Sequence, residues 1–528
     1  MKIVRKGVCG AAALAVLMCG CYNYKAPASA TLGDSYTERK QDDADEMFKN
    51  IKTLSLLDAQ RIAIRNNPTY IAAYHSVEAA RMRYYQAWGA YSPTISANFS
   101  LQNGHSWVRD SAGEPRRDAF NVGLGIQANM LIFDGFARFF KLKAAKSSLK
   151  YQEYMEEDAC RTMMLSVAYA YNTVLLAIEQ RRIAMEDRKF QLDSLQNTQY
   201  KFEAGAAPLS DVLNFEILVN NAEVNMIEAD YSYDTAVYAL AVLMGYPDGT
   251  LPVDLKFSEN YKAQFRELPA VEIYLDAALA NRPDLKAYRE QLNIARYQVY
   301  QAWGAYSPTV NGYVSLGFDS NSVDNNYSYM GRRYSEDFAL SYGLSANWTI
   351  FNGAIRYNQL REAQANMAAT DFQVAAQWFK VVDEVRTAYA NYIQSVKKTK
   401  LYDRVRELSA KQRDLVDDEY RAGNAELTRL NEAQRDLVQA ETNLASSHIN
   451  VQNARAQLDA VVGGNTADYY LNDGDKSKQS NYPGLGNLPN AVDAARSEAP
   501  VKDAAAGNAA GNQPAAPAIP ASATAPAK

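Results

Sequence analysis

The sequence is poor in the residues that build metal centres. Of its 528 residues, three are histidine and four are cysteine. Cys9, Cys19 and Cys21 lie close to the N-terminus, which leaves Cys160 without a disulfide partner in the body of the chain. No metal-ligand spacing recurs, and no nucleophile, base and orienting group cluster in the sequence. We therefore expect no metal, no cofactor and no catalytic residues.

Strong net charge and long apolar runs are also lacking. The formal net charge is −5, which gives no reason to expect a nucleic-acid partner. No uninterrupted apolar run of about 18 residues follows the N-terminal region, so we predict no transmembrane helix.

The N-terminus has the pattern of an export signal. A positively charged start precedes a short apolar stretch, Val8 to Met18, and then Cys19-Gly20-Cys21. This end resembles a bacterial lipobox with Cys21 as the acylated residue, although Met18 and Cys19 depart from the usual pattern. We predict a signal peptide at 1–20 and a lipid anchor on Cys21. By resemblance to bacterial lipoproteins, Tyr22 after the cysteine, rather than Asp, favours sorting to the outer membrane. The alternatives are acylation of Cys19 and an ordinary secretory signal.

A ten-residue string, YQAWGAYSPT, occurs twice. It spans Tyr85–Thr94 and again Tyr300–Thr309, at an offset of 215 residues. After a three-residue insertion the correspondence continues, with Ile132–Gly135 (IFDG) matching Ile350–Gly353 (IFNG). Such agreement indicates an internal duplication, so the chain reads as two copies of one unit.

The duplication predicts the domain boundaries. We place the first copy at 54–267 and the second at 268–464. An N-terminal extension occupies 21–53. An equatorial segment and a disordered Ala/Pro-rich tail occupy 465–528, where the composition lacks the apolar bulk needed to fold.

Four stretches alternate apolar and polar residues for about ten residues each. The predicted strands are about 94–104, 120–133, 309–319 and 338–351. In the first, Ile95, Ala97, Phe99 and Leu101 alternate with small polar residues. This pattern is typical of hairpins in a membrane β-barrel, and the alternative is a half-buried sheet in a soluble domain. We expect helix–strand joints at Pro93 and Pro308, where proline cannot continue a helix, and at Gly135 and Gly353.

Two runs of 69 residues contain neither glycine nor proline, 136–204 and 354–422. Both are rich in good helix formers, and shorter runs of the same kind follow Gly205 and Gly423. We predict two long antiparallel helical hairpins with these glycines at their tips. Four strands cannot close a barrel by themselves, and an open edge cannot face lipid, so a membrane sheet requires several copies of the chain.

The joints, the strand exits and the tip motifs together resemble the TolC family of outer-membrane efflux channels, over about Leu54 to Gly464. With Cys21, the chain most resembles the lipoprotein branch that serves drug-efflux pumps. The resemblance implies an α+β membrane protein that forms a homotrimer. It implies a twelve-stranded β-barrel in outer-membrane lipid and a periplasmic α-helical barrel. It also implies two partners, a periplasmic adaptor protein and an inner-membrane transporter.

The resemblance also assigns roles at the hairpin tips. It implies adaptor docking near Gly205 and Gly423, and an acidic constriction past the second tip. The two acidic positions of the family correspond to Arg429 and Glu432, and Asp211 occupies the equivalent position in the first copy. We predict a periplasmic gate from these three residues. Asp211 and Arg429 form an ion pair across the tip or remain two separate solvated charges.

These observations favour a passive exit channel for drugs or other small molecules, fed by a tripartite pump. Two alternatives stay open. One is a duct for secreted proteins, and the other is a structural rod in the cell envelope, which the alternating strands argue against.

Overall fold

The computed structural model describes residues 52–107, 116–246, 249–252, 255–257, 261–325 and 333–463. The chain divides into two units, Met1–Gly474 and Asp475–Lys528, and every described residue belongs to the first. The predicted signal peptide, the predicted lipid anchor at Cys21 and the predicted tail lie outside the described residues.

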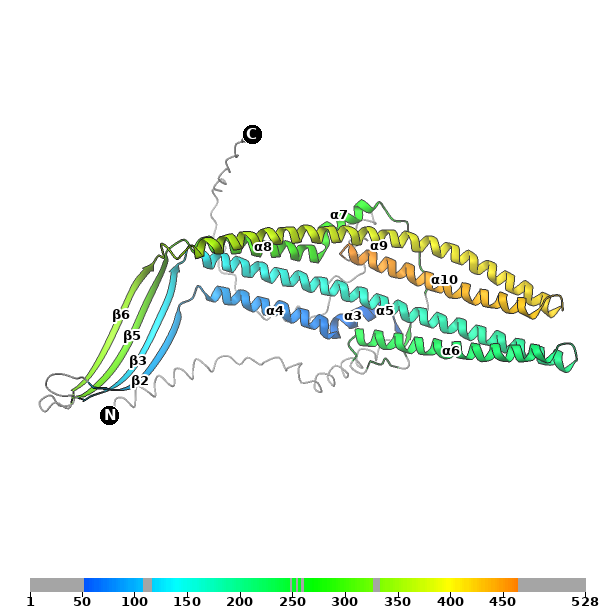
Figure 1. Ribbon diagram of the computed structural model, residues 1–528, viewed down its shortest axis with the longest axis horizontal. Coiled ribbons are helices and arrows are strands. Elements are labelled where there is room, and N and C mark those ends of the chain that lie inside the picture. The colour runs from blue at the N-terminus through cyan, green and yellow to red at the C-terminus, as the bar shows by residue number, and fades with distance from the viewer. Residues whose placement is uncertain are drawn as a thin grey trace, which may run out of the picture. The chain divides into compact units, whose positions relative to one another are not determined.

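The two halves of the chain contain the same series of elements (Figure 1). The first half consists of β1 (Thr53–Leu54), α3 (Leu56–Asn66), α4 (Pro68–Gly89), β2 (Thr94–Trp107), β3 (Arg116–Phe133), α5 (Ala137–Glu203) and α6 (Leu209–Leu243). The second consists of β4 (Lys256–Phe257), α7 (Val271–Asn281), α8 (Pro283–Gly304), β5 (Thr309–Asn325), β6 (Arg333–Asn347), α9 (Ile355–Arg421) and α10 (Leu427–Val461).

Corresponding helices have equal lengths. Helices α5 and α9 each have 67 residues, and α6 and α10 each have 35. Both long helices end at a glycine with positive φ, Gly205 at 73° and Gly423 at 79°. After α5, the Ala206 amide donates to the Lys201 carbonyl at 2.7 Å, the long bond of a Schellman cap. These caps end each long helix where the sequence predicts the hairpin tip.

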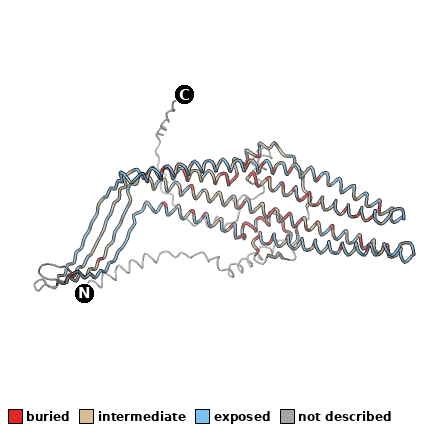
Figure 2. Tube along the Cα trace, in the orientation of Figure 1, coloured by how far each residue is buried: buried red, intermediate tan, exposed pale blue. Residues whose placement is uncertain are grey.

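The helices pack side by side in a fixed order. Near the sheet the order is α4, α5, α8, α9, and near the tips it is α6, α5, α10, α9. The buried core is split between the halves. Val167, Val174 and Leu240 belong to one cluster, and Val381 and Val385 belong to another. Buried positions concentrate along the packed sides of the helices, whereas most strand positions are exposed or half-buried (Figure 2). By the packing order, α6 and α9 are the two outermost helices near the tips.

The four long strands form one antiparallel sheet in the order β2, β3, β5, β6. Because directly paired residues share a sheet face, the register sorts the side chains into rows. The apolar rows are Phe99, Leu124, Phe318, Phe338; Ala97, Ile126, Leu316, Leu340; and Ile95, Ala128, Val314, Tyr342. A polar row between them is Ser96, Gln127, Ser315, Ser341. One face of the sheet is thus apolar across all four strands, and the other is polar.

The strand boundaries differ from the sequence prediction at both ends. Strands β2 and β5 run on to Trp107 and Asn325, into segments predicted as loops, because backbone pairing continues after the apolar alternation has stopped. At the other end β6 stops at Asn347 rather than at 351. Its partner β5 begins at Thr309, directly after Pro308, so no paired backbone remains beyond that point.

One helix among the described residues is apolar enough over 18 residues to meet the composition criterion for a membrane span. It is α5, whose best window has a mean hydropathy of 1.2 and is 50% buried within the structure. The core helix of a soluble protein meets the same criterion, so this window is weak evidence for a span. The sequence prediction of no spanning helix considered only uninterrupted apolar runs and missed this window.

Candidate functional site

The tips of the two helical hairpins lie next to each other at the end of the helices away from the sheet (Figure 1). A small buried cluster joins them: Phe215, Val416, Leu430 and Ala433. Phe215 comes from α6, whereas Val416 comes from the end of α9. The cluster therefore ties the first hairpin to the second just behind the tips.

Polar contacts add to this cluster. The Lys201 ammonium lies 4.5 Å from the centre of the Tyr420 ring and donates a 3.4 Å hydrogen bond to the Tyr420 carbonyl. Farther from the tips, Gln434 Nε2 donates to Asp187 Oδ1 at 2.8 Å. Both contacts join α5 of the first hairpin to the second hairpin. They hold the two hairpins together toward the ends of the helices farthest from the sheet.

Among the described residues, the three residues predicted to form a gate make no ion pair with one another. Arg429 Nη1 lies 2.9 Å from Glu419 Oε2, an ion pair inside the second hairpin. Asp211 is half-buried and accepts a 3.4 Å hydrogen bond from Ser210, while Glu432 is exposed. Within the described part of one chain, Asp211 and Arg429 form no ion pair, and a pair between copies stays a prediction. Glu419 lies one turn before the tip of the same hairpin, and it is this carboxylate that pairs with Arg429.

Sequence reasoning missed the contact between Lys201 and Tyr420. Each residue stands within four positions of a tip glycine, and the two lie on different hairpins. A signal was present, since an aromatic side chain and a lysine both precede predicted tips. Contact between the tips of the two hairpins was not predicted from the sequence.

The helix–strand joints form a second constellation, built twice. Gly135 and Phe136 both have φ of 66°, and Gly353 and Ala354 have φ of 68° and 66°. Left-handed backbone is unfavourable for residues with a side chain, so Phe136 and Ala354 must be held by neighbouring contacts. The predicted joints at Gly135 and Gly353 thus contain two consecutive left-handed residues each.

An arginine holds each joint. Arg138 donates to the carbonyls of Ile132 at 3.0 Å and Ala90 at 3.3 Å, which ties the end of β3 to the end of α4. Arg356 donates in the same way to the carbonyls of Ile350 at 2.9 Å and Ala305 at 3.1 Å. Each guanidinium also lies over a tyrosine ring. Neither arginine was predicted from the sequence, although both stand three residues after the joint glycine.

The two joints differ in their surroundings. A Cβ on Gly135 would lie 2.5 Å from the Gly304 carbonyl oxygen and 2.5 Å from Ser307 Cβ. A Cβ on Gly353 would meet no atom of the described residues within 4 Å, and the same is true at Gly89, the first-half counterpart of Gly304. The first joint therefore packs against the second half of the chain, whereas the second joint faces open space.

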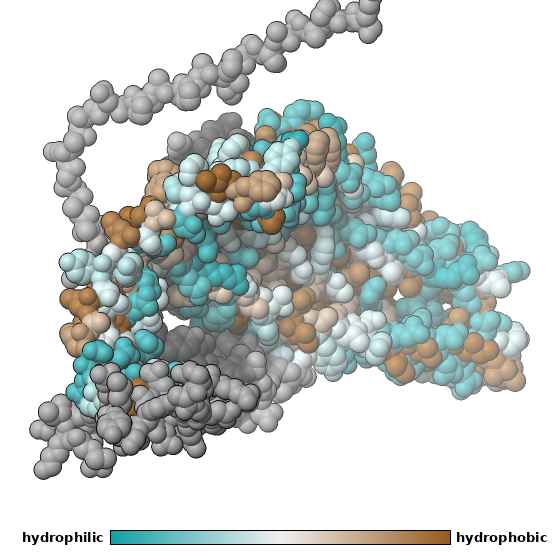
Figure 3. Space-filling view, turned by 60° about the vertical axis from the view of Figure 1, so that its left-hand side comes forward, coloured by the Kyte–Doolittle hydropathy of each residue, from teal (hydrophilic) through white to brown (hydrophobic). Residues whose placement is uncertain are grey.

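Apolar stripes that no other described residues cover run along both outermost helices. On α6 the stripe contains Ile217, Val224, Ile227, Tyr231 and Tyr238, spaced three, four or seven residues apart and all at least 49% exposed. On α9 it contains Leu401, Val405, Leu408 and Leu415, with the same kind of spacing. Figure 3 shows apolar side chains on the surface of both the sheet end and the far end of the helices. Such spacing is typical of helix faces that pack in a coiled coil.

No group of three or more His, Cys, Asp or Glu side chains that could hold a metal occurs within the described part of the chain. The constellations at the tips and joints consist of packing and polar contacts, and they offer no nucleophile with an adjacent base.

Comparisons with known proteins agree on one family. The chain is 26% identical over 358 residues to the alkaline protease secretion protein AprF of Pseudomonas aeruginosa, covering 66% of this chain and 72% of AprF. It is 23% identical over 399 residues to the outer membrane protein TolC of Escherichia coli, covering 74% of this chain and 77% of TolC. Among solved structures, the outer-membrane channel OprN superposes with a TM-score of 0.64 at 19% identity, covering 82% of this chain and 92% of OprN.

The family model for outer membrane efflux proteins matches residues 60–246 and 274–464, one segment in each half of the chain. The family consists of efflux proteins of the outer membrane and not of enzymes. The chain belongs to the outer membrane efflux protein family.

Proposed function

We propose that the chain is the outer-membrane exit channel of a tripartite pump and passively conducts drugs or other small molecules. The observation that carries the proposal is the sheet, in which three successive rows of one face are apolar across all four strands and whose two edge strands pair with no other described strand. An exposed apolar face of this size is unfavourable in water and favourable against lipid. Because open edges are not tolerated in lipid, the sheet must close with further copies.

The proposed closure is head to tail. The free edges of the sheet are β2 and β6. The outermost helices are α4 and α9 near the sheet, and α6 and α9 near the tips. At each level one free edge comes from the first half of the chain and the other from the second half. A head-to-tail ring pairs the two at all three levels at once. Three copies would supply twelve strands, an even number within the known range for such barrels.

Several features of the proposed channel rest on the family resemblance. They are the homotrimer, the periplasmic α-helical barrel, the anchor on Cys21 and docking of a periplasmic adaptor at Gly205 and Gly423. The energy for transport would come from an inner-membrane transporter joined through that adaptor. Asp211, Arg429 and Glu432 remain proposed gate residues, acting between copies rather than within one chain.

The contacts between Lys201 and Tyr420 support a closed state of the gate, because they hold the two hairpin tips of each copy together. We expect Lys201→Ala to favour an open state, since it removes a hydrogen bond and a cation–π contact together worth about 1 kcal/mol in each copy. Single-channel recordings in planar bilayers should show a higher conductance for this variant. Lys189→Ala, an exposed position on the same helix, serves as the control. Equal conductance of Lys201→Ala and the wild type would contradict the proposal that the Lys201–Tyr420 contacts favour the closed state.

The two joint glycines should separate folding from assembly. Gly135→Ala places a methyl group against Gly304 and Ser307 of the same chain, so we expect it to reduce folding of the monomer. Gly353→Ala meets no atom of the described residues, so its cost to folding is limited to the strain of a side chain at positive φ, and we expect a protease-resistant monomer that assembles poorly. Gly317→Ala, on β5 with open space around it, is the control. Gel filtration in detergent and limited proteolysis measure the two effects, and identical behaviour of both joint variants would argue against head-to-tail closure.

The proposed function is tested by antibiotic and dye accumulation in a strain that lacks the gene. We expect accumulation to rise on deletion and to fall again when the intact gene is restored. Gly423→Trp should not restore efflux, because it adds a bulky side chain to a tip residue with positive φ. Unchanged accumulation in the deletion strain would remove small-molecule efflux from consideration.

One observation favours a second function. AprF, a relative over 66% of this chain, is by name a protein that secretes alkaline protease. A duct for secreted proteins would use the same closed sheet and the same gate. Loss of particular proteins from the culture medium of the deletion strain, with accumulation unchanged, would support this alternative.

A further inference from the structure

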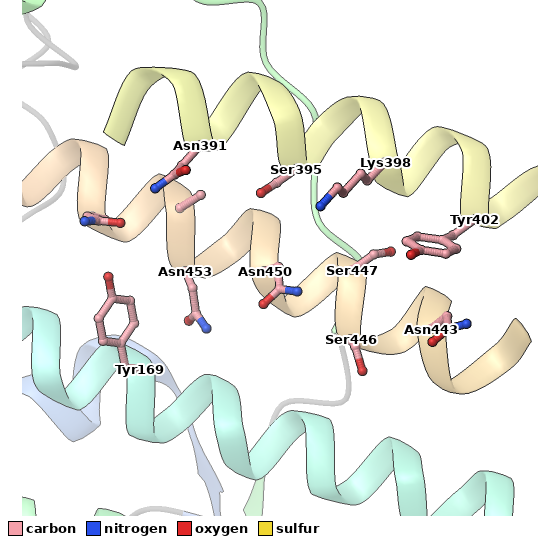
Figure 4. A pocket seen from close by; sticks show the side chains of 12 residues that line it. Tyr169, Asn391, Ser395, Lys398, Tyr402, Asn443, Ser446, Ser447, Asn450 and Asn453 are labelled. Atoms are coloured by element: carbon pink, nitrogen blue, oxygen red, sulfur yellow. The ribbon is translucent and has the colours of Figure 1, made fainter. Parts of the chain in front are cut away.

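A polar groove lies between three helices, midway along α10. It has a volume of about 420 Å³ and is lined from α5, α9 and α10 (Figure 4). Tyr169 stands on the α5 side, Asn391 and Lys398 on the α9 side, and Ser446 and Asn450 on α10. The volume falls within the range of about 300–1,000 Å³ that small-molecule sites occupy.

The face of α9 and α10 that is turned away from the groove is already covered. There, the Ala263 amide donates to His448 Nδ1 at 3.3 Å, and Gln452 Nε2 donates to the Tyr261 carbonyl at 2.8 Å. The Arg266 amide donates to the Tyr392 hydroxyl at 3.0 Å. The segment around residues 261–266 therefore packs across one side of the helix pair, and the groove opens on the other.

The groove holds hydrogen-bonding groups that the chain leaves unused. Asn453 Oδ1 accepts a 2.7 Å bond from Asn172, but Asn391, Ser446 and Asn450 make no side-chain hydrogen bond within the described part of the chain. Lys398, the one charged residue in the lining, forms no ion pair with any described residue. No aspartate or glutamate lines the groove.

This chemistry excludes one class of ligand and selects another. An apolar ligand would cover amides, hydroxyls and an ammonium without replacing their bonds to water, which is costly. A polyhydroxylated ligand would satisfy the amides and hydroxyls, and a carboxylate on it would pair with Lys398 through a charge-assisted hydrogen bond.

We propose that the groove between α5, α9 and α10 is a binding site for anionic sugars, with Lys398 binding the carboxylate and Asn391 and Asn450 binding hydroxyl groups. The site goes beyond the proposed function, because binding in the groove does not require that the chain conducts anything. The groove would bind ligands according to their charge, in a protein whose sheet has one apolar face.

The test uses the full chain in detergent and three monosaccharides as probes. Glucuronate carries a carboxylate, glucose is uncharged, and glucosamine carries a positive charge. Saturation-transfer NMR titrations are expected to show glucuronate binding more tightly than glucose, and glucose more tightly than glucosamine. Lys398→Gln should weaken glucuronate binding about tenfold, the effect of one charge-assisted hydrogen bond, and should leave glucose binding unchanged.

Two further variants make the test specific. Lys397→Gln removes a neighbouring exposed charge that does not line the groove, and it should leave glucuronate binding unchanged. Asn450→Ala, at an exposed position that does not threaten folding, should weaken glucuronate and glucose alike. Equal binding of glucuronate and glucosamine by the wild type would overturn the proposal, as would Lys397→Gln having the same effect as Lys398→Gln.

Discussion

Ile227→Asp is expected to prevent assembly while leaving the monomer folded. Ile227 is 64% exposed on the α6 stripe, opposite the face that packs on α5, so the single chain does not need it. In a head-to-tail ring this side chain would be buried, which contributes about 1.5–3 kcal/mol per copy. A buried unpaired carboxylate would add a further penalty. Analytical ultracentrifugation in detergent should show monomers in place of the oligomer.

Leu408→Asp, on the α9 stripe, is expected to have the same effect from the other side of the interface. A mixture of the two variants provides the sharper test. The intact α9 of one variant can pair with the intact α6 of the other, so the mixture should form dimers that cannot close a ring. Asn225→Asp, exposed on α6 away from the stripe, is the control. Full-size oligomers in the mixture, or in either variant alone, would contradict head-to-tail pairing.

Arg282→Met is expected to destabilise the helical region strongly. Arg282 is 1% exposed, and its guanidinium forms a bidentate pair with Asp284 and a 2.6 Å contact with Glu384. It also donates to the Val461 carbonyl at 3.3 Å. Removing the cation leaves the Asp284 carboxylate buried and unpaired, which costs about 3–5 kcal/mol. Circular dichroism during thermal unfolding in detergent should show a clear fall in the midpoint.

The first half of the chain supplies the matched control for this prediction. Asn67 occupies the position of Arg282, and its side chain donates to the Leu243 carbonyl, the counterpart of Val461. Thr69 occupies the position of Asp284, and its amide donates to the Asn67 side chain. The double variant R282N/D284T therefore introduces the side-chain cap of the first half and removes the buried charges of Arg282 and Asp284. It should be more stable than Arg282→Met, and the reverse order would show that the ion pair is not the cause.

The same pair predicts sensitivity to acid. Burial disfavours the charged form of Asp284, but hydrogen bonds from Arg282 and its positive charge outweigh burial and lower the pKa of the carboxyl. A lowered pKa in the folded state means that the stabilisation is present above the ordinary carboxyl pKa of about 4. It is lost as the pH falls through the folded-state value. Unfolding midpoints should therefore fall more steeply below pH 4 for the wild type than for R282N/D284T.

The larger elements were predictable because their signals are local and repeated. The glycine-free runs indicate α5 and α9 to within a few residues, since Gly205 and Gly423 end them by the same Schellman geometry. The alternation from Ile95 to Leu101 likewise indicates β2. The far ends of the strands were not predictable, because backbone pairing beyond the apolar rows leaves no mark in the sequence.

The contacts at the tips and joints were not predictable for a different reason. The pairing of Arg429 with Glu419, in place of Asp211, depends on which rotamer reaches a partner across a turn. The bonds of Arg138 and Arg356 depend on where a strand end meets a helix end that lies about 40 residues earlier in the chain. Distances of this kind are set by packing, and spacing in the sequence does not encode them.

The unequal surroundings of Gly135 and Gly353 have a kinetic consequence for the proposed ring. A chain can finish its first joint by itself, so that step is unimolecular and its rate does not depend on concentration. The second joint also forms within the chain, but in the proposed ring its open side is covered only by another copy, so the rate of that covering step rises with the concentration of chains. Dilution would therefore leave the protein folded with the second joint uncovered, and a low concentration of the chain would delay assembly more than it delays folding.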